Sequence, residues 1–258
     1  MGGMLRRNWR SLTFASVVGF SVGNYVYFLG IRQTQANVGA AIYTTYPVYI
    51  SIYSIFLLDE RDDLNRKFAG YALGVTGVLG LMTNFDLAAL LEPGGLAGNA
   101  LVVLGALMFS FYPVLGKRIQ IREREVVPAV DLKFTAISMG LAAVGNLVML
   151  AAMEERKTLF QYTLEAWALV LLLGTITTGL SMYLFFVGVR EIEVSKGMSI
   201  AMLKPVLTTM FAFFILGEVP TPALLASLPL VMLAVWLVTG TGKKEVEVQG
   251  GGFEPPDS

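Results

Sequence analysis

Long apolar runs joined by short polar links make up most of this chain. Eight of these runs predict membrane-spanning helices, at 11–31, 37–58, 68–83, 96–116, 134–152, 166–189, 195–216 and 222–240. An α-helix rises about 1.5 Å per residue, so roughly 20 residues cross the hydrocarbon core of a bilayer. The pattern predicts an all-α membrane protein of eight transmembrane helices, with no soluble domain inserted between them.

Composition supports this prediction. Of the 258 residues, 55% are hydrophobic and 15% are charged, whereas soluble domains carry about 25% charged residues. The formal net charge is zero, and no basic arm suited to nucleic acid occurs. The basic start with Arg6, Arg7 and Arg10 resembles that of a signal peptide, but the run at 11–31 is too long for one and lacks a cleavage site.

The basic residues of the links predict the orientation in the membrane. With eight spans, fifteen Lys and Arg residues lie on the side of the N-terminus, and only Arg32, Arg156 and Lys157 lie on the other side. Cytoplasmic loops carry the excess of basic residues. We therefore expect a multi-pass protein of the plasma membrane with both termini in the cytoplasm. Residues 241–258 are rich in glycine, proline and charge and predict a disordered cytoplasmic tail.

The chain contains an internal repeat. A shift of 158 residues superimposes 25–60 on 183–218 without a gap and gives eleven identities over 36 positions. The identical pairs are Tyr25/Tyr183, Phe28/Phe186, Gly30/Gly188, Arg32/Arg190, Gly39/Gly197, Ile42/Ile200, Pro47/Pro205, Val48/Val206, Phe56/Phe214, Leu58/Leu216 and Glu60/Glu218. Unrelated apolar helices would match at only a handful of these positions.

The repeat predicts inverted topology. Five crossings separate Glu60 from Glu218, and an odd number places them on opposite faces of the membrane. Inverted repeats are typical of secondary transporters, which bind substrate near the midplane where the repeats meet. The first repeat, 1–85, has three helices and the second, 96–240, has five, because the helices at 96–152 have no mates. Either the protein begins about 60 residues upstream or it is an eight-helix protein.

Two runs resemble the signatures of a known family. YFLGIRQTQANVGAAIYTTYPVYISIYSIFLLDE, ending at Glu60, and FFVGVREIEVSKGMSIAMLKPVLTTMFAFFILGE, ending at Glu218, resemble the two half-signatures of EamA-type transporters of the drug/metabolite transporter superfamily. In each run, small residues open a helix, a proline lies at its middle, and an apolar stretch leads into glutamate. The resemblance covers residues 11–240 and implies two inverted five-helix repeats, of which the first two helices are lacking here.

The resemblance also implies a function. The chain departs from the family pattern in two respects. Family members transport small organic metabolites or drugs, and their first helix, absent here, helps to line the cavity. The last helix usually bears glycine, whereas this one has Pro229 and no glycine before Gly240. That difference weakens an inference of dimerisation through this helix, although a homodimer stays compatible with the sequence.

Lys204 is the sharpest candidate for substrate binding. It lies about nine residues into the span at 195–216, near the bilayer centre. A lysine there costs about 2.5–3.5 kcal/mol on insertion scales, so it should face a polar cavity or a partner. It could bind a carboxylate or phosphate of a substrate, or titrate if burial lowers its pKa. The alternative is that its side chain extends to an interface.

Several tyrosines lie within the equivalent span of the first repeat. Tyr46 is the repeat mate of Lys204, and Tyr43, Tyr46 and Tyr53 share one helix face. Buried hydroxyls need hydrogen-bond partners or water. The tyrosine face is interpreted as a cavity wall that stacks on substrate, with packing between helices as the alternative. Asn24, Tyr112, Tyr183 and Thr208 are further candidates for this wall.

The prolines and glutamates of the repeat predict conformational and structural roles. Pro47 and Pro205 each remove a backbone hydrogen bond at symmetric positions, which suits gating. Glu60 and Glu218 end their helices and are expected to tie a helix end to neighbouring backbone or to a basic residue. Gly70, Gly74, Gly77 and Gly80 form a small-residue face suited to close helix packing, with a dimer interface as the alternative.

These patterns favour a secondary transporter of small organic molecules that works by alternating access. The chain has no cysteine and no histidine, and no helix carries two deep carboxylates. These absences argue against an enzyme and against disulfides or histidine metal sites, and no cofactor is expected. The alternative is a non-transporting remnant or a membrane subunit that functions only in an assembly.

Overall fold

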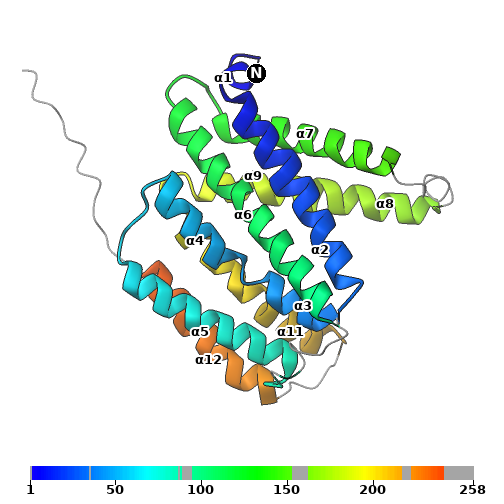
Figure 1. Ribbon diagram of the computed structural model, residues 1–258, viewed down its shortest axis with the longest axis vertical. Helices are drawn as coiled ribbons and strands as arrows, with labels where there is room; N and C mark the ends of the chain where they lie inside the picture. Colours follow the sequence, from blue (N-terminus) through cyan, green and yellow to red (C-terminus); the bar gives the residue numbers. More distant parts are fainter. Residues whose placement is uncertain are drawn as a thin grey trace, which may run out of the picture.

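The computed structural model describes residues 2–34, 36–86, 88, 95–152, 162–216 and 222–240. All the regular structure in these ranges is helical (Figure 1). The elements are α1 (Gly2–Thr13), η1 (Phe14–Val22), α2 (Gly23–Ile31), α3 (Ala36–Tyr43), α4 (Tyr46–Leu57), α5 (Leu64–Thr83), α6 (Leu96–Glu123), α7 (Val130–Ala152), α8 (Leu164–Leu172), η4 (Leu173–Leu180), α9 (Ser181–Gly188), α10 (Val194–Ser199), η5 (Ile200–Met202), α11 (Leu203–Leu216) and α12 (Pro222–Thr239). The prediction of an all-α membrane protein is confirmed.

Within the described ranges, seven helical stretches are long and apolar enough to cross a membrane. The predicted span at 68–83 corresponds to α5, a helix of 20 residues whose glycines and basic first turn make it less apolar. The predicted tail at 241–258 lies outside the described residues.

Several helices extend further than the sequence predicted on one side of the bundle. We call this side the N-terminal face; α1, α5, α7 and α10 begin there. The first helix starts at Gly2 rather than residue 11. The predicted link at 117–133 is mostly helical, because α6 continues to Glu123 and α7 begins at Val130. Charged residues extend these helices because they find partners on this face, which an apolar pattern does not reveal.

Helix boundaries recur with the 158-residue offset. The π-helical stretches η1 and η4 start and end at equivalent positions to within a residue. The helices α5 and α12 begin at equivalent positions. Both copies of the proline-bearing span are also divided, into α3 and α4 in the first repeat and into α10, η5 and α11 in the second.

The packing of α5 on α12 shows that the repeats are inverted. Gly70 lies against Val238, Gly74 against Ala234 and Gly77 against Val231, so the two helices run antiparallel. They lie side by side in Figure 1 and bury a cluster that includes Tyr71, Val78, Leu224 and Val231. Because α5 and α12 are repeat mates, their antiparallel contact places the pseudo-two-fold axis between them.

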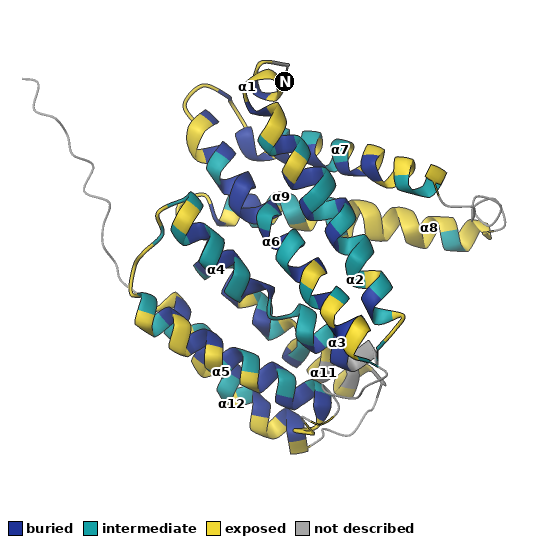
Figure 2. Ribbon diagram, in the orientation of Figure 1, coloured by how far each residue is buried: buried dark blue, intermediate teal, exposed yellow. Residues whose placement is uncertain are grey.

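The glycine face of α5 therefore serves packing within the chain. A second cluster surrounds Tyr112, Phe134 and Phe186, where α6, α7 and α9 meet. A third surrounds Tyr46, Ile50 and Phe109, where α4 meets α6. In contrast, α8 and η4 contain no buried residue, and α8 is coloured as exposed along nearly all its length in Figure 2.

We predict that Gly70→Ala destabilises the protein. A Cβ atom at this position would lie 2.7 Å from Val238 Cγ2 and 3.0 Å from the backbone oxygen of Ala234. Overpacking of this kind costs about 1–3 kcal/mol, so thermal unfolding in detergent should shift to lower temperature. Gly140→Ala is the matched control, because a Cβ there meets nothing within 4 Å. An unchanged melting temperature for Gly70→Ala would show that α5 and α12 separate easily.

Candidate functional site

The site is built around the two divided spans. Thr44 and Thr45 separate α3 from α4, and the short helix η5 separates α10 from α11. Pro47 is the second residue of α4 and Pro205 is the third residue of α11. Proline is tolerated in the first turn of a helix, where its missing N–H costs little. Each proline thus follows a local change in helical hydrogen bonding inside one span, at Thr44 and Thr45 and at η5, and its role in gating stays a prediction.

A cavity of about 360 Å³ lies beside the break in the second repeat. It is lined mainly by apolar residues of α9, α10, η5 and α11, with Tyr46 and Phe109 from α4 and α6. Its lining includes Ser181, Met182, Phe185, Met198, Lys204 and Leu207. The volume is within the usual range for sites that bind small molecules.

Lys204 and its repeat mate Tyr46 both line this cavity, but their surroundings differ. Tyr46 is 5% exposed and meets the ring of Phe109 edge-on, with 5.4 Å between ring centroids. Lys204 is exposed, and the cavity beside it opens to the outside of the bundle. The site therefore combines one cation with an aromatic wall.

Other predicted residues lie beyond the immediate lining. Tyr43 stacks near Tyr27 at 4.0 Å between centroids, and its hydroxyl lies 3.5 Å from Asn24 Oδ1. Through Tyr46, at 5.6 Å between ring centroids, Tyr43 joins the aromatic wall. Asn24 also donates to the backbone oxygen of Phe20 at 2.7 Å. Tyr43 and Asn24 therefore pack behind the aromatic side chains that line the cavity.

Three further candidates are placed elsewhere. Tyr112 is fully buried, and its hydroxyl lies 3.0 Å from Ser138 Oγ, so it packs between α6 and α7. Tyr183 is half-buried on α9, and Thr208 is exposed one turn after Lys204; neither is part of the cavity lining. Phe109 and Phe185 were missed by the sequence reasoning, because a phenylalanine in an apolar run gives no signal of its position.

Glu60 caps a helix of the other repeat. Its carboxylate accepts hydrogen bonds from the backbone N–H groups of Val194 at 2.8 Å and Ser195 at 3.3 Å, and from Ser195 Oγ at 3.1 Å. These groups open α10, so Glu60 satisfies donors that the helix itself leaves without partners. Burial raises the pKa of the Glu60 carboxyl above its ordinary value, and the backbone donors oppose this shift. Glu218 lies outside the described residues.

Ionic contacts join the repeats on the N-terminal face. Arg7 pairs with the buried Glu123, which also accepts from Asn8 Nδ2 at 2.6 Å. Lys67, fully buried, pairs with Glu193 at 2.8 Å. In both pairs the cation comes from the first repeat and the carboxylate from the second. Buried charges need such partners, so these contacts join the two repeats on this face.

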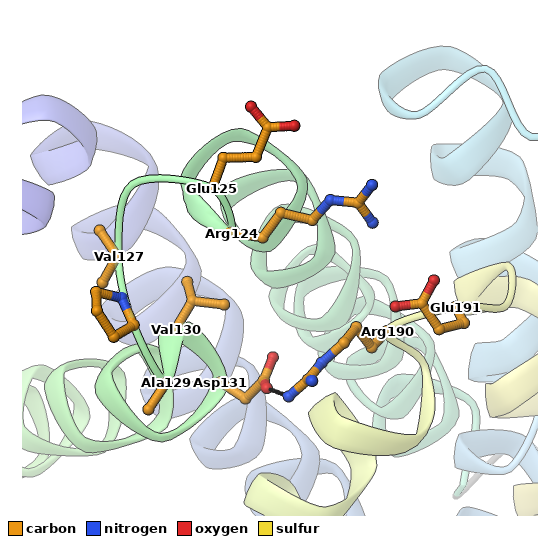
Figure 3. Close-up of a pocket in the computed structure, with 9 residues that line it drawn as sticks. Arg124, Glu125, Val127, Ala129, Val130, Asp131, Arg190 and Glu191 are labelled. Carbon is orange, nitrogen blue, oxygen red and sulfur yellow. Dashed lines mark hydrogen bonds and ion pairs between the residues drawn. The ribbon is translucent and has the colours of Figure 1, made fainter. Parts of the chain in front are cut away.

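A second hollow, of about 500 Å³, lies on the same face between α6, α7 and the link after α9. Figure 3 shows Arg190 directed at Asp131, with which it forms an ion pair. Gln120 Nε2 also donates to Asp131 at 2.5 Å. Because the buried carboxylate is already neutralised, this hollow is less suited to a charged ligand than the cavity at Lys204.

Within the described ranges, no group of three or more metal-binding side chains occurs. The lining of the cavity at Lys204 combines one cation with aromatic and other apolar side chains.

Comparison with known proteins gives a family match across both repeats. The profile described as the EamA-like transporter family matches residues 2–83 and 96–240. Three curated relatives are described only as uncharacterized transporters. They are YyaM of Bacillus subtilis (strain 168), at 24% identity over 81% of this chain, and proteins of Methanothermobacter thermautotrophicus, at 24% over 83%, and Clostridium kluyveri, at 22% over 80%.

The chain spans 66%, 59% and 64%, respectively, of the length of these relatives. A solved crystal structure superposes on the chain with a TM-score of 0.73 at 20% identity, covering 92% of this chain and 78% of the other. At that identity, the likeness concerns the fold.

We predict that Glu60→Ala lowers stability, because it leaves two backbone N–H groups and a hydroxyl of α10 without their acceptor. Unsatisfied buried donors cost on the order of 1–3 kcal/mol each. Glu60→Gln keeps one acceptor oxygen and should lie between Ala and the native protein in thermal unfolding. Glu125→Ala removes an exposed carboxylate on the same face and serves as control. Equal unfolding temperatures for the Glu60 and Glu125 variants would contradict the capping role.

Proposed function

The chain belongs to the EamA-like transporter family, and we propose that it acts as a secondary transporter. In this proposal it moves small organic metabolites or drugs across the plasma membrane by alternating access, with both termini in the cytoplasm. The observation that carries the proposal is the cavity beside η5 in the second repeat, whose lining includes Lys204, Tyr46 and Phe109.

The lining of the cavity favours a substrate that is both anionic and apolar. Lys204 supplies a cation that can pair with a carboxylate or phosphate. Tyr46 and Phe109 offer ring faces and edges to an organic moiety. Lys204 is the second residue of α11, and it lies inside the helical span Val194–Ile215 rather than at either end of it.

The inverted repeats provide a reason for alternating access. Two equivalent half-structures can exchange conformations, which gives states of similar energy open to opposite sides. The pairs Arg7–Glu123 and Lys67–Glu193 cross from one repeat to the other on the N-terminal face. Opening toward the cytoplasm would separate such pairs, and divided helices give the second halves freedom to tilt.

A second candidate function is that of a membrane subunit that acts only in an assembly. It is favoured by the absence of buried residues in α8 and η4, which leaves the side chains of 164–180 available to a partner. An enzymatic role finds no support, because the chain has neither histidine nor cysteine.

The proposal predicts that Lys204→Ala weakens substrate binding and lowers flux. A thermal-shift screen of purified protein against metabolites bearing carboxylate or phosphate groups would provide the test substrate, and flux is then measured in proteoliposomes. Loss of a charged hydrogen bond costs about 1.5–3 kcal/mol, which corresponds to roughly 10- to 150-fold in affinity.

Lys204→Arg keeps the charge and should retain part of the binding. Lys133→Ala is the matched control, because it removes the same side chain at the start of α7, away from the cavity. Equal amounts of each variant in the membrane must be verified. Flux by Lys204→Ala equal to that of the native protein would exclude the cavity as the transport site.

A further inference from the structure

We propose that a hollow between the ends of α4 and α6, on the N-terminal face, is a binding site for an anionic phospholipid. In this site Arg118 and Arg122 hold the phosphate of the headgroup, and Phe56 and Ile121 contact the acyl chains. The inference goes beyond the proposed function, because it concerns the lipid around the protein and does not depend on which substrate is transported.

The hollow lies where two membrane spans end. Its volume is about 440 Å³. Residues 56–59 line one side, and Arg118, Ile121 and Arg122 of α6 line the other. The helices α4 and α6 belong to the spans Val38–Leu57 and Leu96–Glu123, and both end on the same side of the bundle (Figure 1). The ends of a span lie at the level of the lipid headgroups, so a headgroup of the adjacent leaflet can reach the hollow.

The two arginines of the hollow differ from other cations of this face. Arg7, Lys67 and Arg190 each form an ion pair. Within the described ranges, neither Arg118 nor Arg122 forms one. They are four residues apart on α6 and therefore lie on the same side of the helix. A guanidinium group presents several N–H donors in a planar fork that matches a phosphate, so this pair is suited to one phosphate group.

The acidic groups next to the hollow already have partners. Asp59, which lines it, lies 2.7 Å from Arg61 Nε. Glu123 pairs with Arg7, and Glu60 accepts hydrogen bonds from the start of α10. The carboxyl ends of α4 and α6 add a partial negative charge, equivalent to roughly half an elementary charge each. Two arginines outweigh both helix ends together, so the hollow keeps a net positive charge.

Apolar side chains beside the arginines favour a lipid over a free phosphate. Phe56 is 78% exposed and Ile121 is 52% exposed. About one turn before Phe56, toward the bilayer centre, Tyr53 stacks on Phe111 of α6 with 4.2 Å between ring centroids. Tyr53 is half-buried. The acyl chains of a bound lipid would therefore cross Phe56 and the outer side of this ring pair, where apolar and aromatic surface continues into the membrane.

A general attraction of basic residues for anionic lipids is the rival explanation. Such an attraction acts on every cation near the membrane surface. It would include Arg124, which is exposed at the end of the same helix but does not line the hollow. The proposal instead assigns the binding to Arg118 and Arg122, and this difference can be measured.

Quenching of a single tryptophan by brominated lipid tests the site in membranes. The three native tryptophans are replaced by Phe, and Phe56→Trp then reports on the hollow. Phe68→Trp is the matched reporter, because Phe68 is an exposed aromatic residue near the start of α5, on the same face and outside the hollow. Each protein is reconstituted into phosphatidylcholine vesicles that contain increasing fractions of brominated phosphatidylglycerol, and brominated phosphatidylcholine with the same chains gives the reference.

We expect the Phe56→Trp reporter to select phosphatidylglycerol over phosphatidylcholine by roughly 25-fold, because each arginine near the surface contributes roughly fivefold. The Phe68→Trp reporter should show a much smaller preference. Arg118→Gln combined with Arg122→Gln should lower the preference at position 56 to that at position 68. Arg118→Lys combined with Arg122→Lys keeps both charges and should retain most of it. Arg124→Gln is the charge-matched control and should leave it unchanged.

Gel filtration in detergent verifies the fold of each variant. Equal preferences at the two reporters, with both arginines intact, would overturn the proposal, and this result does not require that the arginine variants fold. A loss with Arg124→Gln as large as that with Arg118→Gln would overturn it in favour of general surface charge. A preference that disappears when inorganic phosphate is added to the buffer would assign the hollow to a free phosphate, and would overturn the proposal of a lipid.

Discussion

The antiparallel contact of α5 with α12 sets the geometry on which the rest of the structure depends. Apolar surfaces gain little by association within lipid, so membrane helices are held by close packing and by hydrogen bonds. Gly70, Gly74 and Gly77 permit that approach, and Gly74 also meets Met202 of η5. The axis that relates the repeats therefore lies next to η5 in the second repeat, and the cavity adjoins the same element.

The lipid environment also explains why the buried charged groups are paired. Buried ions in a membrane protein need partners, and on the N-terminal face Lys67, Glu123 and Asp131 each have one. These pairs allow α6 to extend to Glu123 and bring the two repeats together. Lys204 is different, because it lies on the cavity rather than at a helix end. That difference is the reason why we propose Lys204 as the cation that binds substrate.

The sequence predicted the features that depend on periodicity and repetition. The apolar helices and the antiparallel packing of repeat mates follow from apolar run lengths and from the 158-residue offset, whereas the depth of Lys204 in the membrane stays a prediction. It did not predict where α6 ends, because Lys117, Gln120 and Glu123 are buried by partners distant in sequence. Tyr112 and Phe109 illustrate the same limit: both lie in one apolar helix, yet only Phe109 lines the cavity. Which side of a helix is open depends on neighbours that only the three-dimensional structure reveals.

The asymmetry between Tyr46 and Lys204 connects the cavity with the incomplete symmetry of the bundle. These mates occupy equivalent places beside a helix break, but α6 covers Tyr46 and no described helix of this chain covers Lys204 in the same way. An aromatic side chain suits a packed position, whereas a lysine suits one that a polar ligand can reach. The two repeats share a fold and differ in what their equivalent positions face. Binding should therefore occur on the second repeat, with the first acting as the wall against which it is held.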